Sequence, residues 1–272
     1  MMVEEVENTE LKQPRSEAKT EPQKTKKHRK WPWIVGIIVI ILLIPILVLG
    51  YFGFVPGVSA IMGANKAKDL GIHWTAADYA SYQQKTGAQF LNFANAPDNP
   101  NRPGKKLVFA DPKQMDVNLT EQEITATINS VGWLWMPIKN AQVRFGDGTV
   151  EISGNVNAQY IPNFVNFIGS VGYPESEVNQ ATRWAKLLGS PAIYIKASAS
   201  VTNDVLTLNV TQAKVGRFSL PMDITSNVLT NGTGSIKTQA TSEGYEAKNV
   251  TFANGQMHFV GTTPTTVYVK KN

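Results

Sequence analysis

The chain has 272 residues, of which 26 are basic and 21 acidic, so its formal net charge is +5. It contains no cysteine, which excludes disulfides, thiolate metal sites and a cysteine nucleophile. Eight of the basic and six of the acidic residues precede residue 31, which leaves 18 basic and 15 acidic side chains for the rest. A nearly neutral domain lacks the basic surface that nucleic acid requires, so we expect no nucleic-acid partner.

Residues 1–30 form a polar segment rich in Glu, Lys, Pro, Gln and Thr. Such a segment has almost nothing apolar to bury, so we expect a disordered tail. Its last residues, from Lys24 to Lys30, are mostly basic and directly precede an apolar stretch. Positive residues beside a membrane span stay in the cytoplasm, so the tail is predicted to be cytoplasmic.

An uncharged stretch extends from Trp31 to Asn65. Its 22 residues from Ile34 to Val55 are almost all aliphatic or aromatic. As a helix they would measure roughly 33 Å, enough to cross a hydrocarbon core of about 30 Å. The sequence therefore predicts a transmembrane helix over residues 31–55 that acts as a signal anchor. The protein would be a single-pass protein of the cell membrane, with everything after Val55 extracytoplasmic.

A cleavable signal peptide is the alternative to an anchor, with cleavage after Ala60. Val58, Ser59 and Ala60 are small enough to serve as a cleavage site. The apolar region before them is longer than the roughly 7–15 residues usual in signal peptides, which favours the anchor. The sequence leaves both alternatives open.

Residues 56–118 are predicted to connect the anchor to a folded domain. Small residues open this region and indicate a flexible stalk. A capping box that begins at Thr75 predicts a helix to about Lys85. A Pro- and Asn-rich loop over residues 95–104 follows, and the apolar run 107–110 is the first predicted strand.

Residues 119–272 read as an extracytoplasmic sheet domain. Thr120 and Glu123 form a second capping box, and Ile124 and Ile128 place an apolar stripe on the helix that it opens. Strands with alternating apolar and polar residues follow, and 164–189 reads as helical material. Tight turns are predicted at Asp147-Gly148, Asn203-Asp204 and Asn254-Gly255. The predicted fold class is α+β, an N-terminal transmembrane helix followed by a mainly antiparallel, twisted β-sheet with a few packed helices.

Groups that could perform catalysis are sparse in this sequence. The three histidines, His28, His73 and His258, lie in three different predicted regions, so no metal site or Ser-His-Asp arrangement can be assembled. The closest carboxylate pairs, at 121/123 and 175/177, fall at predicted helix starts, where the helix dipole favours acids. We therefore expect no enzyme, no metal and no cofactor.

Part of the sheet domain resembles a known family. The residues that carry the resemblance are Leu119–Ile124, Val143–Phe145, Asp147–Gly154, Ala213–Gly216 with Pro221, and Gly255–Gly261. They are similar to the YpmS-like family of single-span bacterial envelope proteins and, more remotely, to LmeA-type tubular lipid-binding proteins. The resemblance implies a curved sheet wrapped around a long helix, with no catalytic residue.

Two functions fit this architecture. The first is a non-enzymatic interaction module of the cell envelope with an envelope protein as its partner. The alternative is binding of a lipid or acyl chain in a groove between sheet and helices, which requires an apolar cavity of about 300 Å³ or more. The predicted groove lining consists of Ile152, Val156, Trp184, Leu206, Leu208 and Val210.

Overall fold

The computed structural model describes residues 31–97, 107–167, 190–222 and 240–271, together with positions 176, 179 and 183. The chain divides into two compact units, Met1–Ile41 and Leu42–Asn272. The predicted tail, most of the Pro- and Asn-rich loop, most of the helical material at 164–189 and Trp184 lie outside the described residues.

Helix α1 (Trp31–Phe52) has 22 residues and includes Pro45. It occupies most of the segment predicted as a helix, and its side chains are described from Val39 onward. The large apolar side chains from Leu42 to Leu49 are each between 38% and 61% exposed. Within the described residues, no helix is both long enough and apolar enough to cross a membrane.

A short helix, α2 (Pro56–Ile61), occupies the segment predicted as a flexible stalk. Arg217 holds the start of this region to the sheet domain. Its backbone N–H donates to the Phe52 carbonyl at 3.3 Å, and its guanidinium donates to the Met62 carbonyl at 2.7 Å. The guanidinium carbon also lies 4.4 Å from the centre of the Tyr51 ring. These contacts connect the end of α1 and the residue that follows α2 to the segment after β6 (Val205–Val215).

Helix α3 (Ala76–Thr86) confirms the helix predicted from Thr75. The Thr75 backbone N–H donates to the Asp78 carboxylate at 2.7 Å, so aspartate takes the place usually held by glutamate in a capping box. Gly87 ends the helix in the left-handed conformation, with φ of 68°.

The remaining described elements form a nine-stranded sheet with helices around it, which confirms the α+β class. The main path of the sheet is β1-β9-β8-β5-β4-β3; β2 pairs with β9, and β6 pairs with β5 and β7. Every described strand pair is antiparallel except β1 with β9. The bounds are β1 (Gln89–Asn92), β2 (Leu107–Thr120), β3 (Ile138–Gly146), β4 (Thr149–Val156), β5 (Ala192–Thr202), β6 (Val205–Val215), β7 (Phe218–Ser219), β8 (Glu246–Ala253) and β9 (Gln256–Val269). Two 3-10 turns, Phe93–Asn95 and Ala158–Tyr160, and helix α5 (Ile161–Phe167) complete the described elements.

All three predicted tight turns are confirmed. Gly148, between β3 and β4, has φ of 61°. Asn203 and Asp204, between β5 and β6, have φ of 50° and 63°, and Asn254 and Gly255, between β8 and β9, have φ of 52° and 70°. At the turns 203–204 and 254–255, two successive residues with positive φ match the twist of the flanking strands, which explains the preference for Asn, Asp and Gly there.

Strands β2 and β9 form the longest ladder, running from Leu107 opposite Val269 to Thr120 opposite Gln256. The sequence predicted only residues 107–110 of β2, and β1 precedes it, so the sheet begins well before residue 119. Residues 111–114 are exposed and contain no aliphatic or aromatic side chain, so the sequence of β2 shows no alternation of apolar and polar residues there. Asp111 also adopts φ of 56° within this strand.

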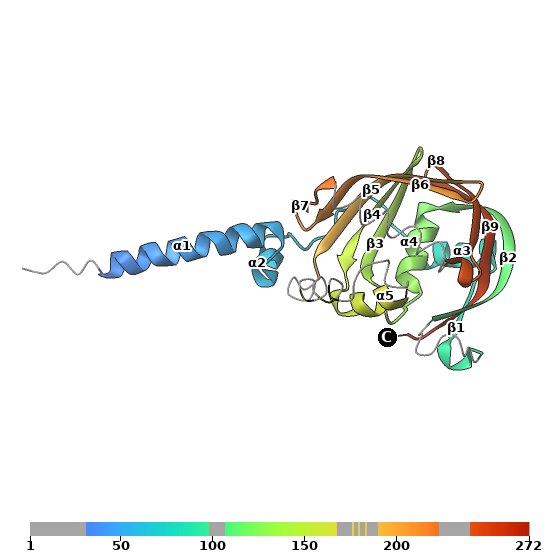
Figure 1. Cartoon of the computed structure of the whole chain (residues 1–272), viewed down its shortest axis with the longest axis horizontal. Coiled ribbons are helices and arrows are strands. Elements are labelled where there is room, and N and C mark those ends of the chain that lie inside the picture. The colour runs from blue at the N-terminus through green and yellow to red at the C-terminus, as the bar shows by residue number, and fades with distance from the viewer. Residues whose placement is uncertain are drawn as a thin grey trace, which may run out of the picture. The chain divides into compact units, whose positions relative to one another are not determined.

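Helix α4 (Glu121–Ser130) follows β2 directly and lies along the edge of β3 (Figure 1). The N–H groups of Phe145, Val143 and Ala141 donate to the side chains of Glu121, Thr125 and Asn129 at 3.0, 2.9 and 3.0 Å. Four helical residues rise about 6.0 Å. Two strand residues rise about 6.7 Å, so the two repeats match. In the described sheet β2 pairs only with β9 and β3 only with β4, so α4 joins the two ends of the sheet.

The burial of α4 differs from the predicted apolar stripe. Its buried residues are Glu123, Thr125 and Ala126, whereas Ile124 and Ile128 are only partly buried. The side of the helix that faces β3 must supply hydrogen-bonding groups, because a bare strand edge presents unpaired N–H groups.

A core cluster lies beneath the β2–β9 ladder. It consists of Leu107, Val131, Trp133, Val267 and Val269, with Phe90, Phe109, Trp135, Met136 and Phe164 packed against it. The residues that follow α4 thus pack against the same ladder.

Replacing Thr125 with valine tests whether the hydrogen bonds from α4 to the edge of β3, which close the sheet, stabilise the fold. The change keeps the shape of a fully buried side chain but leaves the Val143 N–H and carbonyl without their partner. We expect Thr125→Val to lower the free energy of unfolding by about 1–3 kcal/mol in denaturant titration. Thr127→Val is the matched control, because within the described part of the chain the Thr127 hydroxyl donates to its own helix, at the Glu123 carbonyl. Equal losses for the two variants would contradict the closure.

Candidate functional site

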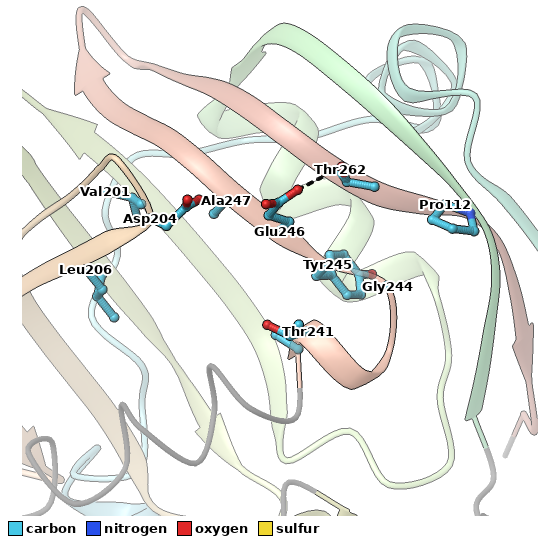
Figure 2. A pocket seen from close by; sticks show the side chains of 11 residues that line it. Pro112, Val201, Asp204, Leu206, Thr241, Gly244, Tyr245, Glu246, Ala247 and Thr262 are labelled. Carbon is cyan, nitrogen blue, oxygen red and sulfur yellow. Dashed lines mark hydrogen bonds between the residues drawn. The ribbon is translucent and has the colours of Figure 1, made fainter.

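A pocket of about 650 Å³, here called the outer pocket, lies between the β5–β6 hairpin and the start of β8 (Figure 2). Its lining residues are Pro112, Val201, Asp204, Leu206, Ala240, Thr241, Gly244, Tyr245, Glu246, Ala247 and Thr262. The polar groups of this lining belong to Asp204, Thr241, Tyr245, Glu246 and Thr262, and the rest is apolar, so the pocket can accommodate apolar groups over most of its surface.

The strand pairing explains why the sheet has a pocket here. β8 pairs with β5 at only two positions, Val201 opposite Val250 and Thr202 opposite Asn249. β6 pairs with β5 and β7 and not with β8, and Leu206 on β6 and Ala247 on β8 both line the pocket. In Figure 2, Val201 and Leu206 lie on one side of the pocket, and Pro112 and Thr262 lie on the other.

The polar groups of the outer pocket include two carboxylates. Glu246 accepts a hydrogen bond from the Thr262 hydroxyl at 3.5 Å, and Asp204 belongs to the β5–β6 turn. The described lining includes no basic side chain. Carboxylates can accept hydrogen bonds from hydroxyl or ammonium groups.

Two smaller cavities, here called the inner cavities, lie between the β2–β9 ladder and helices α3 and α4. The first has about 150 Å³ and is lined by Tyr82, Ala88, Phe90, Leu107, Phe109, Thr127, Val131, Trp133, Met136, Tyr245, Pro264 and Val267. The second has about 140 Å³ and is lined by Tyr82, Thr86, Met115, Val117, Leu119, Ile124, Tyr245, Met257, Phe259 and Thr263. Tyr82 and Tyr245 line both, and Tyr245 also lines the outer pocket.

Tyr245 is held in place by aromatic and polar contacts. Its ring meets the Phe109 ring edge-on, with 5.3 Å between centroids, and its N–H donates to the Ala240 carbonyl at 2.9 Å. Burial raises the pKa of the Tyr245 phenol, as does the neighbouring Tyr82, against the opposing effect of a hydrogen bond with the Thr263 side chain. The phenol therefore stays neutral, and the wall between the outer pocket and the inner cavities carries no charge.

The structure places one of the predicted groove residues in the outer pocket. This residue is Leu206, which is 43% exposed. Val210 is buried with Ala197 and Ala213, and Leu208 packs against that cluster. Ile152 and Val156 are partly buried on β4, and Trp184 lies outside the described residues. Of the five predicted groove residues that the structure describes, Leu206 alone lines the outer pocket.

On β4 the polar face is the more buried one, contrary to the predicted pattern. Glu151 and Ser153 are 6% and 0% exposed, whereas Ile152 is partly buried. Leu70 and Ile72 pack on Tyr194 of the adjacent strand, so the segment after α2 covers this face of the sheet. Because this covering segment is distant in sequence, the alternation of residues within β4 does not indicate which face is covered.

Glu151 is a buried carboxylate at the centre of an ionic cluster whose three cations are partly exposed. It contacts Arg144 at 2.6 Å, the Tyr194 hydroxyl at 2.6 Å, Lys196 at 3.5 Å and Lys68 at 3.6 Å. Burial would raise the pKa of Glu151, but hydrogen bonds from Tyr194 and Arg144 and the charges of Arg144 and Lys196 lower it from 4.5 to about 2. A general acid or base works best with a pKa near the operating pH, so this geometry suits a structural anion.

Sequence reasoning missed Val201, Tyr245 and Glu246 as lining residues. Gly244 and Tyr245 directly precede the alternating strand β8, which marks them as a turn before a strand but not as a cavity wall. These residues line the pocket because β8 pairs with β5 at two positions and then separates from it. No local pattern in the sequence indicates where the two strands separate.

The chain was compared with protein-family models, curated proteins and solved structures, and none of them matches it. The resemblance to YpmS-like and LmeA-type proteins therefore stays a prediction.

Glu151→Gln tests the ionic cluster through pH. The lowered pKa of Glu151 stabilises the folded chain above pH 4.5, and this contribution is lost as the pH falls from 4.5 toward about 2. We expect Glu151→Gln to lower the melting temperature at neutral pH and to flatten its decline in that acidic window. The control is Asp116→Asn, which removes a carboxylate that is 75% exposed. Parallel pH profiles for wild type and Glu151→Gln would contradict this assignment.

Proposed function

We propose that this chain is a membrane-anchored extracytoplasmic protein of the cell envelope whose sheet domain binds the acyl chain of a lipid. The outer pocket carries the proposal, because its volume of about 650 Å³ and its mainly apolar lining suit an apolar ligand. Ligand pockets commonly occupy about 300–1,000 Å³. The function is non-enzymatic in this proposal, since binding an acyl chain requires no catalytic group.

The membrane anchor rests on α1 and its flanks. Trp31 to Asn65 include no charged residue, and the apolar side chains of the second half of α1 are exposed to solvent rather than packed. Exposed apolar surface on that scale marks a contact with a membrane or a partner. The basic residues from Lys24 to Lys30 would keep the N-terminus in the cytoplasm and the sheet domain outside.

The carboxylates of the outer pocket narrow the ligand class. Asp204 and Glu246 can accept hydrogen bonds from hydroxyl or ammonium groups. A lipid whose head group carries hydroxyl or ammonium donors therefore fits the pocket.

An interaction module is the second candidate, and one surface feature favours it. Phe54 and Phe218 are 38% and 39% exposed, with their ring centroids 6.0 Å apart. Aromatic residues are enriched in protein interfaces, so this pair could receive an envelope protein partner. This candidate would be supported if the chain bound no lipid but bound an envelope protein through a contact at Phe54.

Leu206→Asp tests acyl-chain binding. The change places a third carboxylate in the outer pocket at a side chain that is already 43% exposed, so the melting temperature should change little. We expect uptake of a fluorescent monoacylglycerol by the full chain in lipid nanodiscs to fall at least about tenfold, as a loss of 1.4 kcal/mol or more would produce.

Val205→Asp is the matched control, because Val205 is the preceding residue of β6, is 63% exposed and is not part of the pocket lining. Its uptake should equal that of the wild type. Equal uptake by both variants would place the ligand elsewhere and overturn the proposed site.

A further inference from the structure

We infer that the two inner cavities receive the far end of the same acyl chain, and that Tyr245 is the residue that determines how deep the chain reaches. This inference rests on the proposed function of the outer pocket. It adds a second compartment to that site and a residue that sets ligand length.

The shared lining is the first support. Tyr245 is the one described residue that lines the outer pocket and both inner cavities, so it separates the outer pocket from each of them. Tyr82 lines both inner cavities and thus stands between them. A chain that extends inward from the outer pocket would therefore meet Tyr245 first.

The chemistry changes from one side of Tyr245 to the other. The outer pocket has the two carboxylates Asp204 and Glu246, whereas neither inner cavity has a charged residue in its described lining. The polar residues of the inner lining are threonines and tyrosines. A polar head would remain at the acidic outer pocket, and only an apolar tail would gain by entering the inner cavities.

The contacts of Tyr245 can be exchanged for contacts with a ligand. The Phe109 ring that meets it edge-on lies in the wall of the first inner cavity, and Thr263 lies in the wall of the second. Gly244, with φ of 85°, precedes Tyr245 and gives its backbone a turn that residues with a side chain rarely adopt. Rotation of the phenol away from Phe109 would open a path from the outer pocket, and the vacated ring contact would be replaced by the chain.

Photo-crosslinking of the full chain in nanodiscs tests this depth. The probes are two palmitoyl monoacylglycerols, one with a diazirine near the head and one with a diazirine at the end of the chain. After illumination, mass spectrometry of peptides locates the labels. We expect the head-side probe to label the region of Leu206 and Ala247, and the tail-end probe to label that of Phe109, Trp133 or Met257.

Two variants of Tyr245 sharpen the result. Tyr245→Trp enlarges the wall and should abolish inner labelling by the tail-end probe while outer labelling by the head-side probe persists. Tyr245→Phe keeps the ring and should leave both patterns unchanged. Melting curves of both variants test whether they fold. If Tyr245→Trp does not fold, the wild-type labelling still decides whether the inner cavities receive the acyl chain.

The outcomes separate the two proposals. Outer labelling without any inner labelling in the wild type overturns the role of the inner cavities but leaves the outer pocket as a lipid site. Absence of labelling at both places, with labels only on α1, overturns the proposed function itself.

Discussion

The structure depends on the hydrogen bonds between helix α4 and the edge of β3. Glu121, Thr125 and Asn129 recur every four residues along the helix and bind the N–H groups of Phe145, Val143 and Ala141. Because α4 follows β2 without an intervening loop, these bonds join the end of one long ladder to the opposite end of the sheet. Glu123 then connects α4 to α3 through Lys85 at 2.8 Å and through Ser81. The two helices are thereby held against the sheet.

The cavities follow from this closure. Both inner cavities lie between the β2–β9 ladder and the helices that Glu123 joins, with Tyr82 of α3 in the lining of each. The outer pocket arises where the closed sheet is incomplete, since β8 and β5 pair at two positions only. Charge is segregated as well: the ionised Glu151 lies in a cluster of cations and Tyr194, and the carboxylates of the outer pocket lie at the β5–β6 turn and the start of β8. An apolar interior beside a polar rim is the arrangement that a lipid tail and its head group require.

Local signals in the sequence predicted the features that are local in the structure. The Thr75 and Thr120 capping boxes and the three tight turns involve residues within four positions of each other, and all are confirmed. Burial of Glu151 and Ser153 was missed because the covering segment comes from residues 65–72. Thr125 and Asn129 are polar residues within a helix, and only the distant edge of β3 explains them. Of the predicted groove residues, Leu206 lies in the outer pocket. The sequence did not predict this pocket, because its position depends on where β8 and β5 stop pairing.

Extraction of bound lipid from the protein tests the central claim most directly. The full chain would be purified from its own membranes, washed in detergent and extracted with organic solvent, and the extract analysed by mass spectrometry. Residues 1–65 fused to an unrelated soluble protein would serve as the control for lipid that adheres to the apolar helix. The account predicts a stoichiometric amount of a lipid with hydroxyl or ammonium donors in its head group, retained by the full chain and absent from the control. Equal lipid content in the two samples would contradict it.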